Sequence, residues 1–194
     1  MFYLNSEFLI LISIPLIIMF NIFYFKSQKR SNLNFFTKHL VWKNLFMLYI
    51  LMVINVTMFP LLIDTQRTVD VFASTNLIPF KETISSFNDL LSLFSTMFAI
   101  RIFLINVLGN IILFMPLGFL LPIINQNFNN IKSIFKISLL STISIESIQF
   151  ITSLFGGTRA TDIDDIILNV LGGLLGFLIF VILSKIKIFK AITN

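Results

Sequence analysis

The chain has 194 residues, of which 57% are apolar and 12% are charged, and its formal net charge is +5. A soluble domain carries about a quarter charged residues, so this composition predicts an integral membrane protein built as one helical domain. The absence of cysteine excludes disulfides, zinc–thiolate sites and thiol nucleophiles. The single histidine, His39, falls in a basic stretch, so a Ser–His or Cys–His catalytic pair is not expected.

Five segments are apolar enough to cross the hydrocarbon core, which requires about 20 residues per helix. They are approximately residues 8–25, 45–63, 102–124, 137–155 and 166–184. No Lys or Arg precedes the first segment and no small-residue cleavage site follows it, so we interpret it as a span and not as a signal peptide. The predicted fold class is therefore all-α, a polytopic membrane bundle of about five transmembrane helices.

Basic residues are distributed unequally between the two sets of connecting segments. The first set holds ten, namely Lys26, Lys29, Arg30, Lys38, Lys43, Lys132, Lys136, Lys185, Lys187 and Lys190. The second set holds four, namely Arg67, Lys81, Arg101 and Arg159. Because loops rich in Lys and Arg remain in the cytoplasm, we predict an external N-terminus and a cytoplasmic C-terminus. All acids except Glu146 fall on the predicted outer side, and the net charge fits contact with anionic lipid and not with nucleic acid.

We divide the chain into three parts: two N-terminal spans with a basic loop (1–63), an outer loop with three spans (64–184), and a basic cytoplasmic tail (185–194). Pro60 is interpreted as the end of the second span. In the outer loop, Pro79 favours an extended or turn conformation just before it. Apolar positions from Ile84 to Phe98 then follow helical spacing. They predict a helix that either lies in the outer interface or packs over the mouth of the bundle.

The third span begins with polar and small residues. Asn106 and Asn110 are four apart and share a helix face near the predicted outer end. Gly109 and Gly118 are expected to permit close approach of a neighbouring helix. Pro116 is expected to kink the span at mid-depth.

Glu146 is the one acid inside an otherwise apolar span. An acid at such depth costs a few kcal/mol and marks a functional site by default. Gln149 shares its face at i+3. The alternative is a structural role, in which Glu146 is neutral or hydrogen-bonded to Gln149 between helices.

The fifth span opens with three acids. Asp162, Asp165 and Asn169 are three and four apart and share a face. Acids in a first turn also stabilise the helix dipole, and Thr161 with Asp164 can form a capping box, so capping alone is the alternative. A hard cation such as Ca²⁺ or Mg²⁺ would suit the carboxylates, but nothing in the sequence requires one, and no metal site or cofactor is assigned.

The remaining features of this region are a glycine strip and one base. The spacing of Gly172, Gly173 and Gly176 predicts tight helix packing. Arg159 is the only base of the short loop before the fifth span. It would pair with Asp162 or Glu146, or bind an anionic group such as a phosphate or carboxylate.

Polar residues from three spans and one loop thus fall in the predicted outer half of the molecule. They are Asn106, Asn110, Glu146, Gln149, Arg159, Asp162, Asp165 and Asn169. Their convergence predicts a polar pocket that opens to the exterior. We expect no polar path through the inner half, where the third and fifth spans are almost wholly apolar, and this disfavours a proton-coupled transporter.

Four motifs in order resemble the VanZ-like family of bacterial membrane proteins. They are NLIPF at 76–80, NVLGNIILFMPLG at 106–118, SIESIQ at 144–149 and RATDIDDIILNVLG at 159–172. The resemblance covers roughly residues 76–177, and the first two spans look generic. It implies a multi-pass protein of the cell membrane, in a family named for a member associated with resistance to the glycopeptide teicoplanin.

Three hypotheses of function follow. The first is a non-enzymatic envelope protein that binds an amphiphile, such as a lipid-linked wall precursor or a lipoglycopeptide, at the outer leaflet. Its binding residues would be Asn76, Asn106, Asn110, Gln149, Arg159, Asp162 and Asn169. The second is an intramembrane hydrolase or transferase on a lipid-linked substrate, with Glu146 as general acid or base and Asp165 as its catalytic partner. The third is an envelope scaffold, in which the polar residues serve packing.

Overall fold

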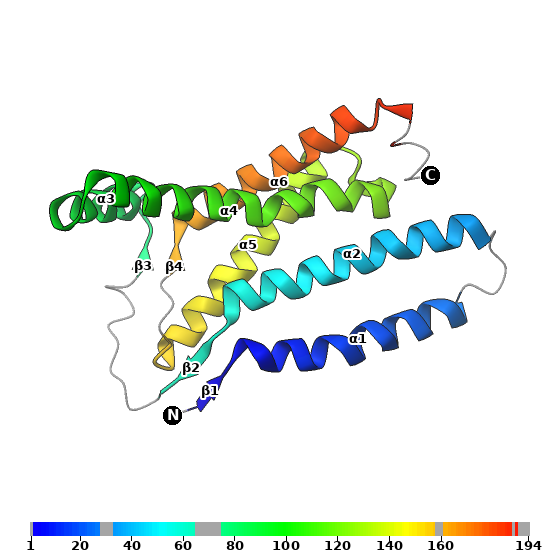
Figure 1. The fold of residues 1–194 in the computed structure, drawn as a ribbon, viewed down its shortest axis with the longest axis horizontal. Coiled ribbons are helices and arrows are strands. Elements are labelled where there is room, and N and C mark those ends of the chain that lie inside the picture. The colour runs from blue at the N-terminus through cyan, green and yellow to red at the C-terminus, as the bar shows by residue number, and fades with distance from the viewer. Residues whose placement is uncertain (1, 28–32, 65–74, 158–160, 188, 190–194) are drawn as a thin grey trace.

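A computed structural model of the chain describes residues 2–27, 33–64, 75–157, 161–187 and 189 (Figure 1). The helices are α1 (Ser6–Ser27), α2 (Leu33–Met58), α3 (Lys81–Leu93), α4 (Thr96–Ile124), α5 (Ile131–Leu154) and α6 (Ile163–Leu183), with a 3₁₀ turn η1 (Gln126–Phe128). The short strands are β1 (Phe2–Leu4), β2 (Leu61–Ile63), β3 (Thr75–Asn76) and β4 (Thr161–Asp162). Five helices in the described part, all except α3, are long and apolar enough to cross a membrane. The predicted all-α membrane bundle is confirmed.

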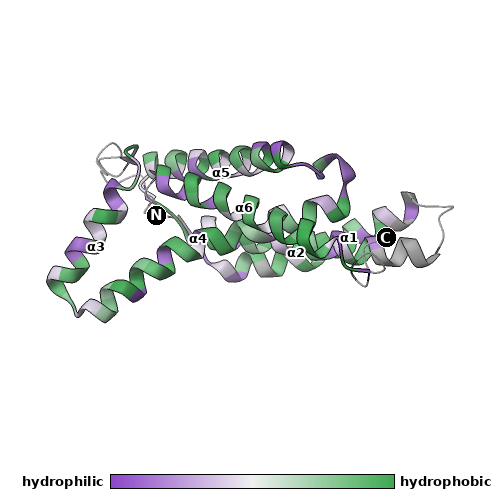
Figure 2. Ribbon diagram, turned by 90° about the horizontal axis from the view of Figure 1, so that it is seen from above, coloured by the Kyte–Doolittle hydropathy of each residue, from purple (hydrophilic) through white to green (hydrophobic). Residues whose placement is uncertain are grey.

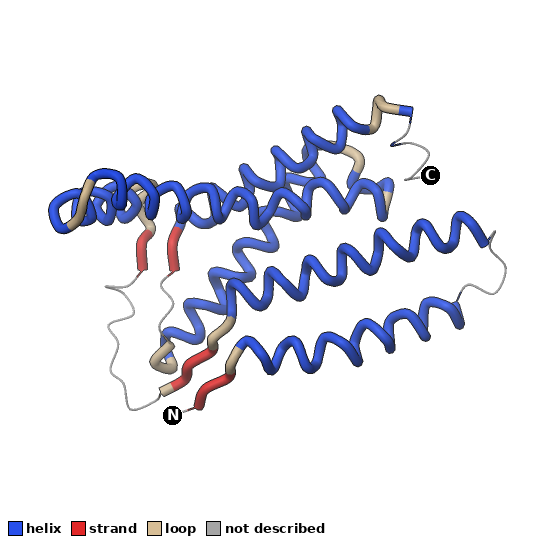
Figure 3. The backbone as a smooth tube through the Cα atoms, viewed as in Figure 1, coloured by secondary structure: helices blue, strands red, loops and turns tan. Residues whose placement is uncertain are grey.

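Two helices end or begin at residues other than those predicted, because a proline or a capping side chain sets the boundary. α2 ends at Met58 and not at 63, because Pro60 has no N–H to continue the helix. The next residues form β2, which pairs antiparallel with β1 beside the start of α1 (Figure 3). α5 begins at Ile131, six residues before the predicted start, since the Asn130 side chain accepts a hydrogen bond from the N–H of Ser133.

The helix before the third span is shorter than the apolar pattern from Ile84 to Phe98 predicts. α3 stops at Leu93, Phe94 is extended, and Ser95 caps a new helix, α4, by accepting a hydrogen bond from the N–H of Phe98. None of the α3 residues is buried. Its Phe87 ring lies 5.1 Å from the ring of Phe103 on α4. Figure 2 shows α3 at one end of the bundle, with hydrophilic and hydrophobic residues alternating along it.

Three helices form the central layer of the bundle. α4 and α6 run in the same direction side by side (Figure 1), and α5 runs antiparallel to α6. A Cβ built on Gly118, Gly172 or Gly176 would lie within 2.1 Å of a backbone oxygen of the facing helix, so α4 and α6 touch backbone to backbone. The predicted tight packing is confirmed at these glycines. It is wrong for Gly109, which has nothing within 4 Å of such a Cβ.

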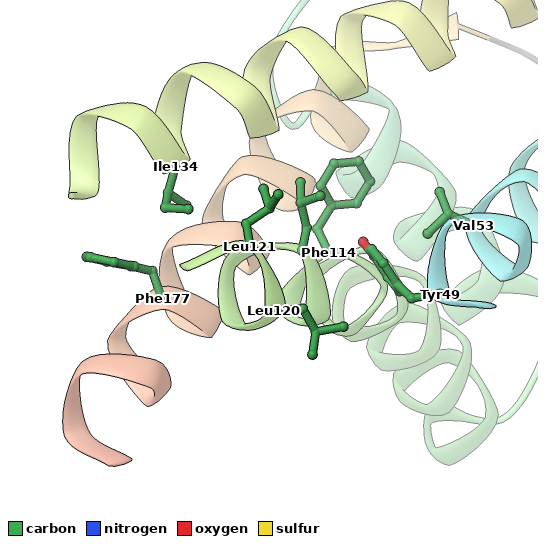
Figure 4. Close-up of a cluster of buried hydrophobic side chains, with 8 residues drawn as sticks. Tyr49, Val53, Phe114, Leu120, Leu121, Ile134 and Phe177 are labelled. Carbon is green, nitrogen blue, oxygen red and sulfur yellow. The ribbon is translucent and has the colours of Figure 1, made fainter. Parts of the chain in front are cut away.

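α2 packs on this layer through an apolar cluster. Its Tyr49 and Val53 belong to a buried cluster that also includes Phe114 of α4, Ile134 of α5 and Phe177 of α6 (Figure 4). The Tyr49 hydroxyl donates a 3.0 Å hydrogen bond to the Leu113 carbonyl of α4.

α1 lies against α2 at the edge of the bundle. A reciprocal pair of 3.0 Å hydrogen bonds joins the side chains of Asn21 and Asn44. In an apolar environment such a pair satisfies both amides and fixes how the two helices meet. The start of α1 and the end of α6 lie at opposite ends of the molecule, as an odd number of spans requires (Figure 1).

Candidate functional site

The four residues 162–165, which we call the carboxylate segment, begin α6. Asp162 is its N-cap, with φ −131 and ψ 126, and its side chain accepts a 2.9 Å hydrogen bond from the N–H of Asp164. The predicted capping box of Thr161 and Asp164 is therefore wrong. The buried Thr161 hydroxyl has no hydrogen-bond partner among the described residues.

Asp162 also joins α6 to β3, the strand before α3. β3 and β4 pair in parallel, with Asn76 opposite Asp162. The Asn76 amide nitrogen donates a 2.7 Å hydrogen bond to the Asp162 carboxylate, and its oxygen accepts one of 3.2 Å from the N–H of Ile78. Two predicted site residues that are far apart in the chain thus meet, and their contact holds the turn before α3.

Asp164 belongs to the site, although the sequence predicted for it only a role in capping α6. Its side chain is 2% exposed. One oxygen accepts a 2.7 Å hydrogen bond from the N–H of Phe80, and the other accepts one from the Thr83 hydroxyl. Phe80 has φ 62, a left-handed conformation that is costly for a residue with a side chain. The carboxylate therefore stabilises the strained turn from which α3 begins.

Asp165 joins α6 to α4. The Asn110 amide nitrogen donates a hydrogen bond to one Asp165 oxygen. The sequence predicts both residues in one site, and the structure brings them together. With Asp162 and Asp164, each acid of the carboxylate segment bonds to a different element.

Glu146 connects α5 to the same segment. Its side chain is 4% exposed, and its Oε2 accepts a 3.0 Å hydrogen bond from the backbone N–H of Asp162. Gln149 does not pair with it, because the Gln149 amide donates a 2.9 Å hydrogen bond to the Thr57 carbonyl of α2. The predicted alternative of a Glu146–Gln149 pair is wrong.

A buried polar row extends from Glu146 along α5. Its members are Ser138, Thr142, Glu146, Gln149 and Ser153. Asn169 of α6 donates a 3.0 Å hydrogen bond to the Thr142 hydroxyl, while its own oxygen, like the Ser138 hydroxyl, has no partner among the described residues. Ser138 and Thr142 lie in the first half of α5, so the fourth span carries the polar row beyond Glu146, while residues 112–124 of α4 and 173–183 of α6 are apolar.

A cavity of about 410 Å³ lies beside the carboxylate segment, between α3, α4 and α6. Four predicted site residues line it: Asn106, Asn110, Asp162 and Asp165. Glu146 and Gln149 lie in the buried row, Asn169 bonds to it from α6 and Asn76 lies in β3, and none of the four lines the cavity. Arg159 is outside the described residues. The sequence predicted one pocket, but the structure has two sites, an open cavity and a buried row. They meet at Asp162, which lines the cavity and donates its N–H to Glu146 of the row.

The cavity combines two chemistries. Its polar lining includes the carboxylates of Glu82, Asp162, Asp164 and Asp165, and no Lys or Arg of the described chain joins them. Its apolar lining includes Phe87, Leu90, Phe103, Leu113 and Leu168. Across the described ranges, no three His, Cys, Asp or Glu side chains are grouped to hold a metal ion. The cavity therefore offers hydrogen-bond acceptors and negative charge next to aromatic and aliphatic surface.

A comparison with family models places this arrangement in a known group. The model described as VanZ/LLP1 matches residues 46–184, from within α2 to just past the end of α6. The match begins earlier than the resemblance of the sequence motifs, so most of the second span belongs to the shared region. No curated protein and no solved structure matches the chain. The chain is a multi-pass membrane protein that belongs to the VanZ-like family.

Proposed function

We propose that this protein binds an amphiphilic ligand of the bacterial cell envelope in the cavity between α3, α4 and α6. One observation carries the proposal. A single cavity of about 410 Å³ is lined both by carboxylates and carboxamides and by phenylalanine and leucine side chains. Ligand sites of this size typically combine apolar lining with a few convergent polar groups.

The polar lining suits a ligand rich in hydrogen-bond donors. Carboxylate oxygens only accept hydrogen bonds, and asparagine amides both donate and accept. Hydroxyl and ammonium groups would therefore pair with this wall, while an acyl or aryl part would contact Phe87 and Phe103. A lipid-linked wall precursor and the lipoglycopeptide teicoplanin both combine such a polar part with a hydrocarbon chain. In the predicted topology the cavity opens at the outer face of the cell membrane, where either ligand would be met.

Arg159 would complete the site for a ligand that also carries an anionic group. It precedes Asp162 by three residues in the sequence. A guanidinium there would bind a phosphate or carboxylate through charge-assisted hydrogen bonds. This role is part of the proposal, and Asp165 and Asn110 would then serve as its polar surroundings.

Binding is favoured over the intramembrane-enzyme hypothesis by the place of Glu146. A general acid or base must reach the reacting atom within hydrogen-bond distance. Glu146 does not line the cavity, and its carboxylate accepts a backbone hydrogen bond at the start of α6. The scaffold hypothesis predicts instead that every polar residue here serves folding, so the test must use a residue that the fold does not need.

Asn106 meets that condition. It lines the cavity, it is exposed, and its side chain makes no hydrogen bond to another described residue. Asn88 on α3 is also exposed and does not line the cavity, so Asn88→Leu is a matched control for Asn106→Leu.

The proposal is tested in a host that lacks its own copy of the protein, by measuring sensitivity to teicoplanin and to vancomycin together with protein abundance in the membrane. We expect the wild type and Asn88→Leu to protect selectively against teicoplanin, and Asn106→Leu to lose that protection at unchanged abundance. Equal protection by both variants would refute a function of the cavity in resistance.

A further inference from the structure

A second cavity lies at the opposite end of the bundle. It measures about 420 Å³ and shares no residue with the first. It is bounded by α1, α2 and the last residue of α4, and its lining is Phe20, Lys43, Phe46, Met47, Ile50 and Ile124. We call it the Lys43 groove. All its lining residues except Lys43 are apolar and half-buried, so the groove is a hydrocarbon surface with one cation.

Lys43 has no anionic partner among the described residues. Its ammonium lies 4.4 Å from the ring centroid of Tyr24 on α1, and Tyr24 in turn stacks at 6.0 Å on Phe20 of the groove. A ring attracts a cation but does not neutralise it. A half-buried ammonium in apolar surroundings is therefore placed to pair with an anion supplied by another molecule.

The charges around the groove have one sign. Six lysines at this end have side chains that the structure describes, and none has an acid nearby in the sequence: Lys26, Lys43, Lys132, Lys136, Lys185 and Lys187. The described acids other than Glu146 lie at the other end, where α1, α3 and α6 begin: Glu7, Asp64, Glu82, Asp89, Asp162, Asp164 and Asp165. Basic pockets between transmembrane helices attract anionic lipid head groups.

We propose that the Lys43 groove binds one anionic phospholipid. Its phosphate would pair with the Lys43 ammonium, and one acyl chain would lie along Phe46, Met47 and Ile50 toward the middle of the membrane. The seven helical steps from Lys43 to Ile50 span about 10 Å, which matches the upper part of an acyl chain. Such a lipid would also fill the space between α1 and α4. This site is independent of the function proposed for the first cavity.

Native mass spectrometry of the full-length protein in detergent tests the site, with phosphatidylglycerol, phosphatidylcholine and soluble glycerol phosphate as separate probes. We expect the wild type to retain one phosphatidylglycerol in preference to phosphatidylcholine and to retain no glycerol phosphate. Lys43→Gln should reduce that preference about fivefold. The matched control is Lys132→Gln, an exposed lysine at the same end that does not line the groove and should leave the preference unchanged.

A second variant tests the hydrocarbon part. Ile50→Trp keeps Lys43 and fills the groove, so it should lower retention of both phospholipids. The proposal is overturned if the wild type retains the two phospholipids equally, if Lys43→Gln and Lys132→Gln lose the preference equally, or if glycerol phosphate binds as well as the lipid does.

Discussion

Asp164 shows how one buried carboxylate can hold an element that sequence patterns do not link to it. It bonds the Phe80 N–H and the Thr83 hydroxyl, both at the start of α3. Asp164→Asn keeps the shape but replaces one acceptor by a donor, and a buried group without a partner costs about 1–3 kcal/mol. We expect a matching fall in stability, measured by thermal unfolding in detergent. The control Asp89→Asn, at an exposed acid of α3, should change stability by less than about 0.5 kcal/mol.

A conservative substitution at Glu146 distinguishes the binding hypothesis from the enzyme hypothesis. Glu146→Gln retains a side-chain oxygen that can accept the hydrogen bond from the Asp162 N–H. We therefore expect wild-type abundance and wild-type protection against teicoplanin for this variant. Glu146→Leu removes the acceptor and should lower stability by about 1–3 kcal/mol. Loss of protection in a fully abundant Glu146→Gln protein would support the enzyme hypothesis instead.

Residue spacing predicted part of this site. The polar faces of the third and fifth spans placed Asn110 and Asp165 near each other, and the structure joins them. Glu146 and Asp164 each accept a hydrogen bond from a backbone N–H, and these two partners were not predictable in the same way. A backbone donor is present at almost every residue and leaves no mark in the sequence, so only the fold identifies it.

At the scale of elements, the α4–α6 contact depends on glycine. A Cβ built on Gly176 would lie 1.9 Å from the Met115 carbonyl oxygen, and backbone atoms cannot yield as a side chain can. We expect Gly176→Ala to push the helices apart and to lower the unfolding temperature and membrane abundance strongly.

Gly109→Ala provides the matched control within α4. Nothing lies within 4 Å of the added Cβ, and alanine is favoured over glycine in a helix by about 1 kcal/mol. We expect unchanged or slightly raised stability. A Gly109→Ala protein as unstable as Gly176→Ala would show that helix propensity, and not close packing, explains the glycines.

The helices themselves were predictable because their length follows from membrane thickness, but several of their ends were not. Ser95 and Asn130 start α4 and α5 several residues before the apolar runs do. Hydropathy responds to the apolar run, whereas a helix begins where a side chain can satisfy its first N–H groups. Spacing likewise could not distinguish Gly118, which touches α6, from Gly109, which faces open space.

At the scale of the whole molecule, charge separates the two ends. All described acids except Glu146 lie at the end that carries the first cavity, and six lysines whose side chains the structure describes lie at the other. This distribution predicts that α3 is outside and η1 is inside. The division of the chain into 1–63, 64–184 and 185–194 remains a prediction of the same kind.

Single cysteines can test this orientation directly because the chain has none of its own. Asn88→Cys on α3 and Asn129→Cys after η1 both place a thiol at an exposed position. In intact cells, a membrane-impermeant maleimide should label the first and should label the second only after permeabilisation. The reverse pattern would invert the topology and would move the first cavity to the cytoplasmic side.

The most direct measurement is ligand binding to the purified protein in lipid nanodiscs by isothermal titration calorimetry, with teicoplanin, vancomycin and an undecaprenyl-linked wall precursor as ligands. We expect the wild type and Asn88→Leu to bind teicoplanin or the precursor with the same Kd. Asn106→Leu should raise that Kd about tenfold, because one hydrogen bond is lost and a ligand group is left unpaired. Equal affinity of Asn106→Leu and the wild type, or no binding of either amphiphile, would contradict a binding function of the cavity.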